Sequence, residues 1–230
     1  PTEPEIARSP ADTCIAVRGF IPPAAFLELQ SLSVLPIACD IRSIDHIGYT
    51  PAPDIVHEAA GHAALLLDSS YSDYLRRYGK IAVNAVQSRW DLDLYEAIRH
   101  LSDIKENPKT TASKIANAEV RLRDVSSSVP FASEGAQIAR MAWWTNEYGL
   151  IGDIKSPLIY GAGLLSSVTE SQSCLSKDVK RVPFTIDCID TPYDITKPQP
   201  QLFVTPNFEH LSLVLEQFAD TMAFRRGGVD

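Results

Sequence analysis

Two histidines five positions apart, His57 and His62, lie in the segment IVHEAAGHAALLL, and Glu58 directly follows the first. Imidazole nitrogens bind metals, and a His-Glu pair followed by a second histidine is typical of zinc proteases. That signature places its histidines four positions apart, where they point nearly the same way on a helix. Five positions apart on a regular α-helix, they diverge by roughly 140°. Both could reach one metal ion only if His57 lies at the helix start or the helix is locally distorted.

Glu147, in the segment MAWWTNEYGL, is the candidate for a third ligand. It is the one carboxylate of an aromatic, otherwise nearly uncharged segment, and a buried carboxylate is costly unless a cation or a donor satisfies it. Two histidines and one carboxylate form the facial ligand set of non-haem Fe(II) oxygenases, which leaves positions open for oxygen and substrates. Two alternatives stay open: the histidines could be core residues bonded to the backbone, and Glu147 could pair with an arginine such as Arg140.

The composition excludes several other classes of protein. The chain has 230 residues, of which 45% are apolar, and this is enough to form the core of one large domain. A net charge of −8 without a long Lys/Arg run argues against nucleic acid or a membrane surface as partner. No apolar run reaches the roughly 18 residues of a membrane span, and the sequence has no targeting pattern. Four scattered cysteines without a CxxC pair argue against a zinc ribbon and a disulfide framework, so we expect a cytoplasmic protein.

Apolar spacing and capping residues predict a mostly α single domain with a small β element. Proline-rich residues 1–22 are expected to form an extended arm, and residues 23–230 the domain itself. Asp54 and Ser133 are predicted helix N-caps, and the helix after Ser133 should be deeply buried. The predicted strands are 181–190 and 201–205. The predicted helices are 22–32, 54–68, 71–90, 91–106, 112–125, 133–150 and 207–224.

Three blocks carry a resemblance to a known family: YTPAPDIVHEAAGH, then WWTNEYGL, then YGAGLLSSVTESQ. In this order they resemble the tetrahydropterin-dependent aromatic amino acid hydroxylases, which act on phenylalanine, tyrosine or tryptophan. The resemblance runs from about Val17 to near the C-terminus and implies the catalytic-domain fold of that family. It implies a monooxygenase with Fe(II), tetrahydrobiopterin or a related tetrahydropterin as cofactor, and O₂ as co-substrate. The implied partner is a small aromatic amino acid, whose ring receives one oxygen atom after iron, pterin and O₂ have reacted.

The same resemblance implies roles for individual residues. The metal ligands would be His57, His62 and Glu147. The pterin would lie against Glu58 and against Gly19, Phe20, Ile21 and Phe26. Arg42 would bind the carboxylate of the substrate, and the other substrate-binding positions would be Thr50, Pro53, Trp143, Ser166, Ser167 and Ile195. The residues expected to take part most directly in catalysis are Glu58, Trp143 and Ser166, the last by orienting a ligand histidine.

The chain departs from the family pattern in several places. Pro36 stands where phenylalanine enzymes usually have a histidine, and Ala142 replaces a bulky aromatic residue. The interval from His62 to Glu147 is 85 positions (147 − 62), longer than in the animal enzymes. We therefore expect a helical insertion at about 88–128, on the outside of the fold because its helices are charged on one face. The tetramerisation helix of animal members is missing, so the expectation is a monomer or weak oligomer.

Substrate choice depends on two positions in this comparison. Ile195 is apolar, which argues against tyrosine, and a tryptophan at position 143 is typical of phenylalanine and tyrosine enzymes. Together they favour phenylalanine, with tryptophan or a modified or carrier-bound aromatic amino acid as alternatives. Less favoured are a zinc hydrolase, because of the five-residue spacing, and a non-catalytic binding domain of the same fold.

Overall fold

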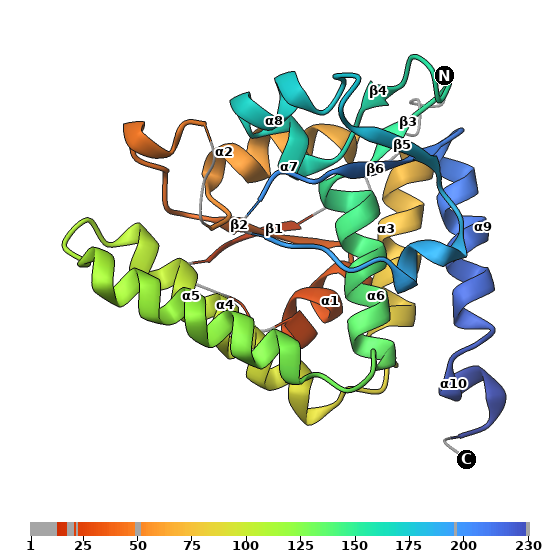
Figure 1. Ribbon diagram of the computed structural model, residues 1–230. Coiled ribbons are helices and arrows are strands. Elements are labelled where there is room, and N and C mark those ends of the chain that lie inside the picture. Colours follow the sequence, from red (N-terminus) through yellow and green to blue (C-terminus); the bar gives the residue numbers. More distant parts are fainter. Residues whose placement is uncertain (1–12, 18–20, 22, 49–51, 196, 229–230) are drawn as a thin grey trace.

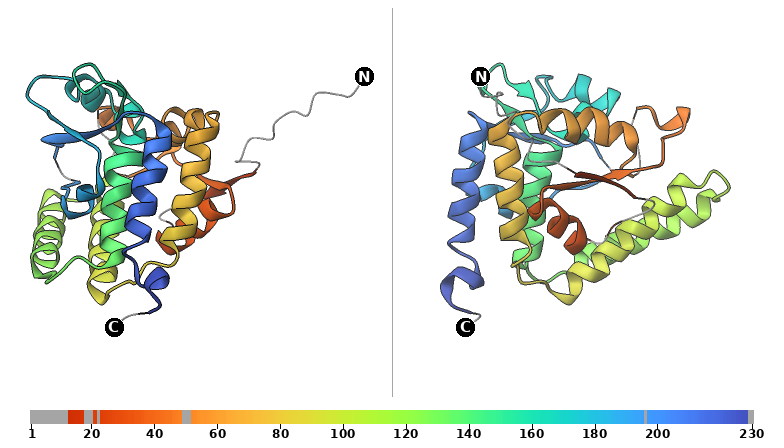
Figure 2. Two further views of the ribbon diagram at one scale, coloured as in Figure 1. Left: turned by 90° about the vertical axis from the view of Figure 1, so that its right-hand side faces the viewer. Right: turned by 180° about the vertical axis from the view of Figure 1, so that it is seen from behind.

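Three helices lie side by side and form the centre of the molecule: α3 (Ser69–Ala82), α6 (Glu134–Ala142) and α9 (Phe208–Ala219) (Figure 1, Figure 2). The computed structural model describes residues 13–17, 21, 23–48, 52–195 and 197–228. Apolar residues recur at helical spacing, so each of the three helices buries one face. The fully buried side chains of this core include Tyr71, Tyr74, Tyr78, Ile138, Met141, Leu211 and Leu215. The predicted mostly α fold is confirmed.

Two small sheets flank these helices. The four-stranded sheet has the order β4-β3-β6-β5, and only the β3–β4 pair is antiparallel. Its strands are β3 (Leu150–Ile151), β4 (Leu158–Ile159), β5 (Lys180–Pro183) and β6 (Gln201–Thr205). The predicted strand 201–205 is therefore confirmed. The other sheet pairs β1 (Thr13–Val17), inside the predicted arm, in parallel with β2 (Val34–Ala38), and α1 (Pro23–Ser31) connects the two.

Several predicted boundaries are wrong. Of the predicted strand 181–190, only the start is extended, because Pro183 lacks an N–H and Thr185 caps a 3₁₀-helix, η4 (Ile186–Asp190). The predicted helix 71–90 breaks after Ala82, where Ser88 and Asp91 form a capping box that starts a new helix. The predicted helix 207–224 ends at Ala219 and is followed by a short helix, α10 (Ala223–Arg226).

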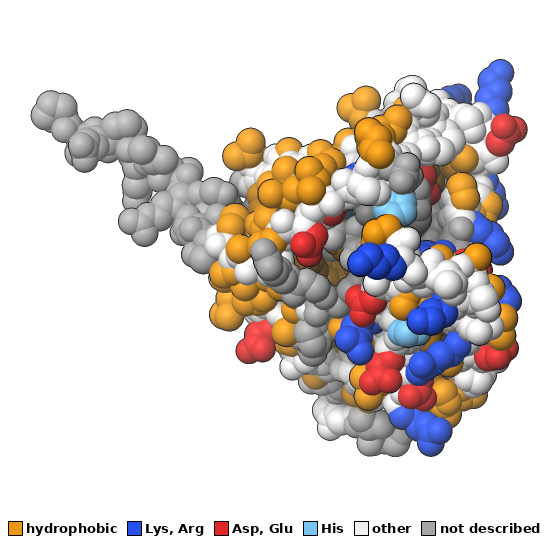
Figure 3. Space-filling view, turned by 90° about the vertical axis from the view of Figure 1, so that its left-hand side faces the viewer, with side chains coloured by type: hydrophobic (Ala, Val, Ile, Leu, Met, Phe, Trp, Pro, Cys, Tyr) orange, Lys and Arg blue, Asp and Glu red, His pale blue; other side chains and the backbone are white. Residues whose placement is uncertain are grey.

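A helical hairpin, α4 (Arg89–Glu106) and α5 (Ala112–Ser128), projects from the body of the molecule (Figure 1). The two helices pack mainly on each other and bury Ala97, Leu101 and Ala118 between them. Charged side chains of both signs cover their outer surface, as Figure 3 shows in the lower half of the view. The predicted solvent-facing hairpin is thus confirmed. Among the described helices, none is both long enough and apolar enough to cross a membrane.

The base of the hairpin is fastened by one carboxylate. Glu134, in the first turn of α6, accepts hydrogen bonds from the backbone N–H groups of Val86 (2.9 Å) and Ala223 (2.7 Å). Val86 precedes α4 and Ala223 begins α10, so Glu134 joins three segments that are far apart in the sequence. This contact fixes where the hairpin leaves the domain.

Two core tyrosines test how much a buried hydroxyl with and without a hydrogen-bond partner contributes to stability. Tyr71 is 0% exposed, and its hydroxyl has no hydrogen-bond partner among the described residues, whereas the Tyr78 hydroxyl donates to the Ile138 carbonyl at 2.9 Å. Burying an unpaired hydroxyl costs free energy, so we expect Tyr71→Phe to leave the melting temperature unchanged or raise it. Tyr78→Phe should lower the free energy of unfolding by about 1 kcal/mol, or the melting temperature by roughly 2–4 °C. Equal losses in both variants, measured by thermal unfolding, would contradict this description of Tyr71.

Candidate metal centre

A π-helical turn brings the two histidines together. The helix α2 (Ile55–His57) continues into the π-helix η2 (Glu58–Ala63). In a π-helix the hydrogen bonds join residues five apart, so positions 57 and 62 are about one turn apart and share a face. The Nε2 atoms of His57 and His62 lie 3.1 Å from each other. The sequence left open a position of His57 at the helix start or a local distortion, and the structure shows both: His57 lies in the first turn, and a π-helix follows it.

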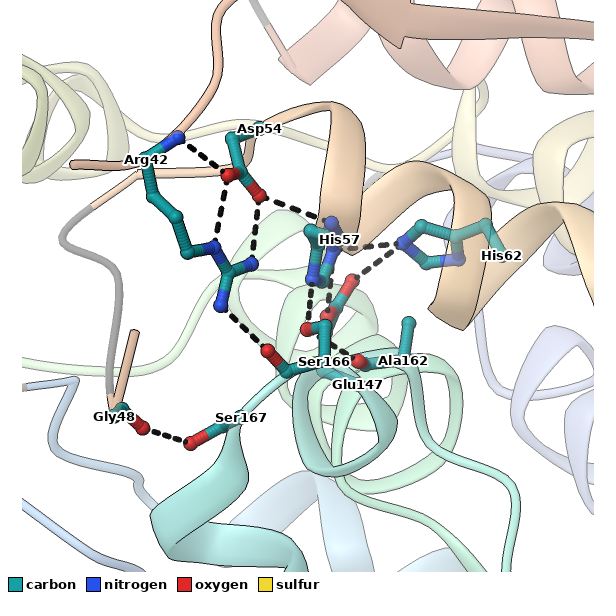
Figure 4. Close-up of polar contacts among 9 residues, drawn as sticks. All are labelled: Arg42, Gly48, Asp54, His57, His62, Glu147, Ala162, Ser166 and Ser167. Carbon is teal, nitrogen blue, oxygen red and sulfur yellow. Dashed lines mark hydrogen bonds and ion pairs between the residues drawn. The ribbon is translucent and has the colours of Figure 1, made fainter. Parts of the chain in front are cut away.

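A second π-helical segment supplies the carboxylate. Helix α6 passes into η3 (Trp143–Glu147), where the N–H of Tyr148 donates to the carbonyl of Trp143, five residues earlier, at 2.9 Å. The Glu147 carboxylate faces both imidazoles, at 3.4 Å from His57 Nε2 and 3.3 Å from His62 Nε2 (Figure 4). The alternative partner, Arg140, donates instead to the carbonyl of Ile189. Glu147 is therefore oriented toward the histidines.

The two imidazoles and the carboxylate form a triangle of groups: the Nε2 atoms are 3.1 Å apart, and each faces a different oxygen of Glu147, Oε2 at 3.4 Å from His57 and Oε1 at 3.3 Å from His62. Ligand atoms about 2.1 Å from a metal ion and at right angles to each other would lie about 3.0 Å apart. Burial lowers the pKa of His57 to about 4, so its ring is neutral near pH 7. Burial alone would raise the pKa of Glu147, but the two histidines lower it to about 2. An anion and an imidazole lone pair directed at one point are stabilised by a cation there, so the triangle fits one face of a metal ion.

Ser166 determines which nitrogen of His57 is available. Its Oγ donates its single proton to the carbonyl of Ala162 (2.8 Å), so it accepts from Nδ1–H of His57 at 2.9 Å. The Nε2 lone pair is then left to face the candidate metal position. Ser166 follows α7 (Ala162–Leu165). This helix can approach the π-helix closely because Gly61 has no side chain: a Cβ there would lie 2.6 Å from the Cβ of Ala162.

The next residue, Ser167, supports the same region in another way. Its side chain caps α8 (Val168–Ser173) by accepting from the N–H of Glu170, and it donates to the carbonyl of Gly48 at 2.7 Å (Figure 4). Residues 166 and 167, adjacent in sequence, thus hold the histidine and the backbone at Gly48.

Arg42 is held by a buried carboxylate next to His57. Its Nε and Nη2 groups donate to the two oxygens of Asp54, at 2.8 and 2.7 Å, and Nη1 donates to the Ser166 carbonyl. Asp54 also caps α2 by accepting from the N–H of His57, as predicted. Burial works against ionisation of Asp54, but these bonds lower its pKa. Contacts with the described residues use three of the five N–H groups of the guanidinium, and the other two could bind a ligand carboxylate.

Glu58 is buried without full hydrogen bonding. The residue is 6% exposed, and its Oε2 atom has no hydrogen-bond partner among the described residues. Burial raises the pKa of Glu58 to about 7. Such an oxygen is an unused acceptor within the π-helical turn, and a ligand with an N–H group could satisfy it.

Aromatic rings form a wall beside Glu147. Trp143 stacks on Tyr148 with ring centroids 4.5 Å apart and on Tyr193 at 4.3 Å with an interplanar angle of 9°. Ile195 is partly buried in the same loop as Tyr193. Contacts of this kind give a rigid apolar surface that suits an aromatic ligand.

The remaining predicted positions are more peripheral or are not described. Ile21 and Phe26 are partly buried, the latter on α1, and Pro53 is exposed next to Asp54. Gly19, Phe20 and Thr50 lie outside the described residues. Sequence reasoning missed the pairing of Asp54 with Arg42 and the stacking of Tyr193 on Trp143. Arg42 and Asp54 are twelve positions apart, and Trp143 and Tyr193 are fifty apart. Separations of this kind carry no periodic signal that would have indicated either contact.

Comparison with known proteins gives consistent results. The model of the family described as biopterin-dependent aromatic amino acid hydroxylase matches residues 10–91 and 115–226. The chain is 28% identical over 200 residues to a phenylalanine-4-hydroxylase of Mesorhizobium japonicum, covering 86% of this chain and 57% of that protein. It is 30% identical over 199 residues to that of Chromobacterium violaceum, covering 86% and 52%. The chain thus spans less than two thirds of the length of these curated relatives.

Solved structures are similar over most of this chain. The phenylalanine hydroxylase of Chromobacterium violaceum, with bound iron(III) and 7,8-dihydrobiopterin, has a TM-score of 0.63 at 28% identity and covers 91% of this chain and 63% of its own. The cold-active phenylalanine hydroxylase of Colwellia psychrerythraea has a TM-score of 0.65 at 27% identity, covering 94% and 69%. The residues matched by the family model include the segments that carry the two histidines and Glu147.

Metal retention tests the triangle directly. We expect His57→Ala or Glu147→Ala to lose bound divalent metal after gel filtration, because the triangle offers no spare protein ligand among the described residues. Far-UV circular dichroism should stay unchanged. His100→Ala, on the exposed face of α4, is the matched control and should retain the metal. Full metal content in either ligand variant, measured by elemental analysis, would contradict the assignment of these residues as metal ligands.

Ser166→Ala tests the support of His57. Loss of the acceptor frees the imidazole to rotate or change tautomer, so metal affinity should fall roughly 10- to 100-fold. Ser171→Ala, whose hydroxyl only contacts the carbonyl of Val168 on exposed α8, should bind metal normally. A metal titration that cannot distinguish the two variants would mean that Ser166 does not orient His57.

Proposed function

This chain belongs to the biopterin-dependent aromatic amino acid hydroxylase family, and from that premise we propose that it is an Fe(II)- and tetrahydropterin-dependent monooxygenase that hydroxylates the ring of phenylalanine. The observation that carries the proposal is the triangle of two imidazole nitrogens and one carboxylate, built on two π-helical turns. This donor set suits iron and leaves half of an octahedral coordination sphere for other ligands.

The residues that would hold the iron are His57, His62 and Glu147. When bound, Fe(II) and the tetrahydropterin supply the electrons that activate O₂ for insertion into the ring. Ser166 keeps the Nε2 lone pair of His57 directed at the metal position by accepting a hydrogen bond from Nδ1–H. The protein thus contributes orientation, and it needs no nucleophile at this centre.

The pterin would bind on the side of Glu58. The buried Oε2 atom of Glu58, which has no hydrogen-bond partner among the described residues, is an acceptor that fits the ring N–H groups of a pterin. Phe26, on α1, offers a partly buried ring for stacking, in keeping with its expected role. We include Gly19, Phe20 and Ile21 in this proposed subsite on the family resemblance.

The amino acid would bind between Arg42 and the aromatic wall. The guanidinium is already fixed by Asp54, so its two remaining N–H groups are oriented before a substrate carboxylate arrives. Trp143, stacked on Tyr193, would form the apolar side on which the substrate ring lies. We propose Ser167, Thr50, Pro53 and Ile195 as further pocket positions. Burial of Arg42, Asp54 and both histidines helps to keep bulk water away from the reacting ring.

We also propose that the α4–α5 hairpin is an insertion on the catalytic domain. The family match is interrupted between residues 92 and 114, inside this hairpin. The hairpin packs mainly on itself, which fits an addition that leaves the core of the domain unchanged.

An assay with three amino acids tests the proposed function. The protein is loaded with Fe(II), supplied with tetrahydrobiopterin and O₂, and given phenylalanine, tyrosine or tryptophan separately. We expect pterin oxidation coupled to a product 16 mass units heavier with phenylalanine. Hydroxylation of tryptophan alone would correct the substrate, and no amino-acid-dependent pterin oxidation would reject the activity.

Arg42→Lys tests how the substrate carboxylate is held. A lysine keeps the charge but loses the planar fork, so KM for phenylalanine should rise roughly 10- to 100-fold. Metal content is measured in parallel, because Arg42 also contacts Asp54 and Ser166. Arg99→Lys, on exposed α4, is the control with an unchanged KM. A normal KM in Arg42→Lys would place the carboxylate elsewhere or mean that the substrate is not a free amino acid.

A further inference from the structure

Gln199 is an unusual residue in the loop between η4 and β6. It is 7% exposed, while its neighbours Pro198 and Pro200 are exposed. A buried amide requires hydrogen-bond partners, and Gln199 has two for its donors. Its Nε2 group donates to the carbonyls of Asp194 (3.0 Å) and Lys197 (2.9 Å). The side chain therefore closes the loop from inside, where the backbone bond from Lys197 N–H to the Asp194 carbonyl is long, at 3.4 Å.

The start of the same loop is fastened to the helix that carries Glu147. The indole Nε1–H of Trp144 donates to the carbonyl of Thr191 at 2.8 Å. Arg140 donates to the carbonyl of Ile189 at 2.9 Å. Both donors lie on α6 and η3, so this end of the loop is fixed relative to the candidate metal centre.

Tyr193 lies between these two fastenings. Its ring is parallel to the indole of Trp143 within 9°, at a centroid distance of 4.3 Å. Trp143 is four residues before Glu147 on η3. The position of the Tyr193 ring thus depends on a loop that is held at its beginning by Trp144 and at its end by Gln199.

We propose that Gln199 is a positioning residue for the amino-acid pocket, which keeps the Tyr193 ring stacked on Trp143 and acts on the substrate only through these two rings. The inference rests on the proposed function, because it assigns the Trp143 wall to substrate binding. A glutamine suits this role since one planar NH₂ group can donate to two carbonyls at once. Methionine has similar length and volume but donates no hydrogen bond.

Gln199→Met is the first test. We expect KM for phenylalanine to rise roughly 5- to 30-fold, the scale set by losing one or two net hydrogen bonds. KM for tetrahydrobiopterin and the iron content should stay unchanged, because the hydrogen bonds that the structure describes for Gln199 go to its own loop and not to the iron ligands or Glu58. The near-UV circular dichroism of the Tyr193–Trp143 stack should weaken. Gln172→Met, on the exposed side of α8, is the matched control and should match the wild type in every measurement.

A double-mutant cycle with Tyr193→Leu separates positioning from general stability. If Gln199 acts through Tyr193, Gln199→Met should change KM for phenylalanine little further in the Tyr193→Leu background. Additive effects on KM, or an unchanged KM and near-UV spectrum in Gln199→Met alone, would overturn the inference while wild-type turnover upheld the proposed function. If the wild type hydroxylates no amino acid, the proposed function fails. The near-UV spectrum of Gln199→Met then decides alone whether this residue holds the Tyr193 ring.

Discussion

The structure depends on keeping three electron-rich groups within 3.4 Å of one another inside the protein. The carboxylate and the imidazole nitrogens are directed at one position, where a cation would be held by all three groups. The backbone is adapted to it at two places, since both segments that carry the donors leave the α-helical pattern for π-helical turns. Rare helical turns of this kind are found mostly at functional sites. The two π-helical turns and the facing donors together support a metal-binding role for this position.

Around this centre, His57 is fixed by residues from different parts of the chain. Ser166 holds the His57 ring, Asp54 caps the helix in which His57 lies, and the same Asp54 orients Arg42. The Arg42 guanidinium returns to the Ser166 carbonyl, so the four residues form a closed set of contacts. A displacement of any one of them would change the hydrogen bonds of the others. Mutual support of this kind gives a site the geometric precision that catalysis requires.

Much of this could be read from the sequence, and the remainder has identifiable physical causes. The five-residue spacing of His57 and His62 required a distorted helix, and the lone carboxylate of the WWTNEYGL segment indicated a partner, so the centre itself was within reach of sequence reasoning. The starts of the helices after Asp54 and Ser133 were placed correctly, because capping residues mark them. The predicted end of the second helix at 150 was wrong, because η3 ends at Glu147 and Leu150 begins β3. The strand predicted through 190 failed because β-branched residues also occur in a 3₁₀-helix once Thr185 caps it. The stacking of Tyr193 on Trp143 depends on tertiary packing alone, which no local pattern records.

The attachment of the α4–α5 hairpin has a consequence for how such a chain can vary. Its two helices pack mainly on each other, and Glu134 joins the base of the hairpin to α10 at the end of α6 that is farther in sequence from Glu147. Changes in the length of the hairpin would therefore alter the outer surface of the molecule and leave the packing of the core unchanged. The hairpin is therefore a place where relatives that catalyse one reaction can differ in their contacts with other molecules.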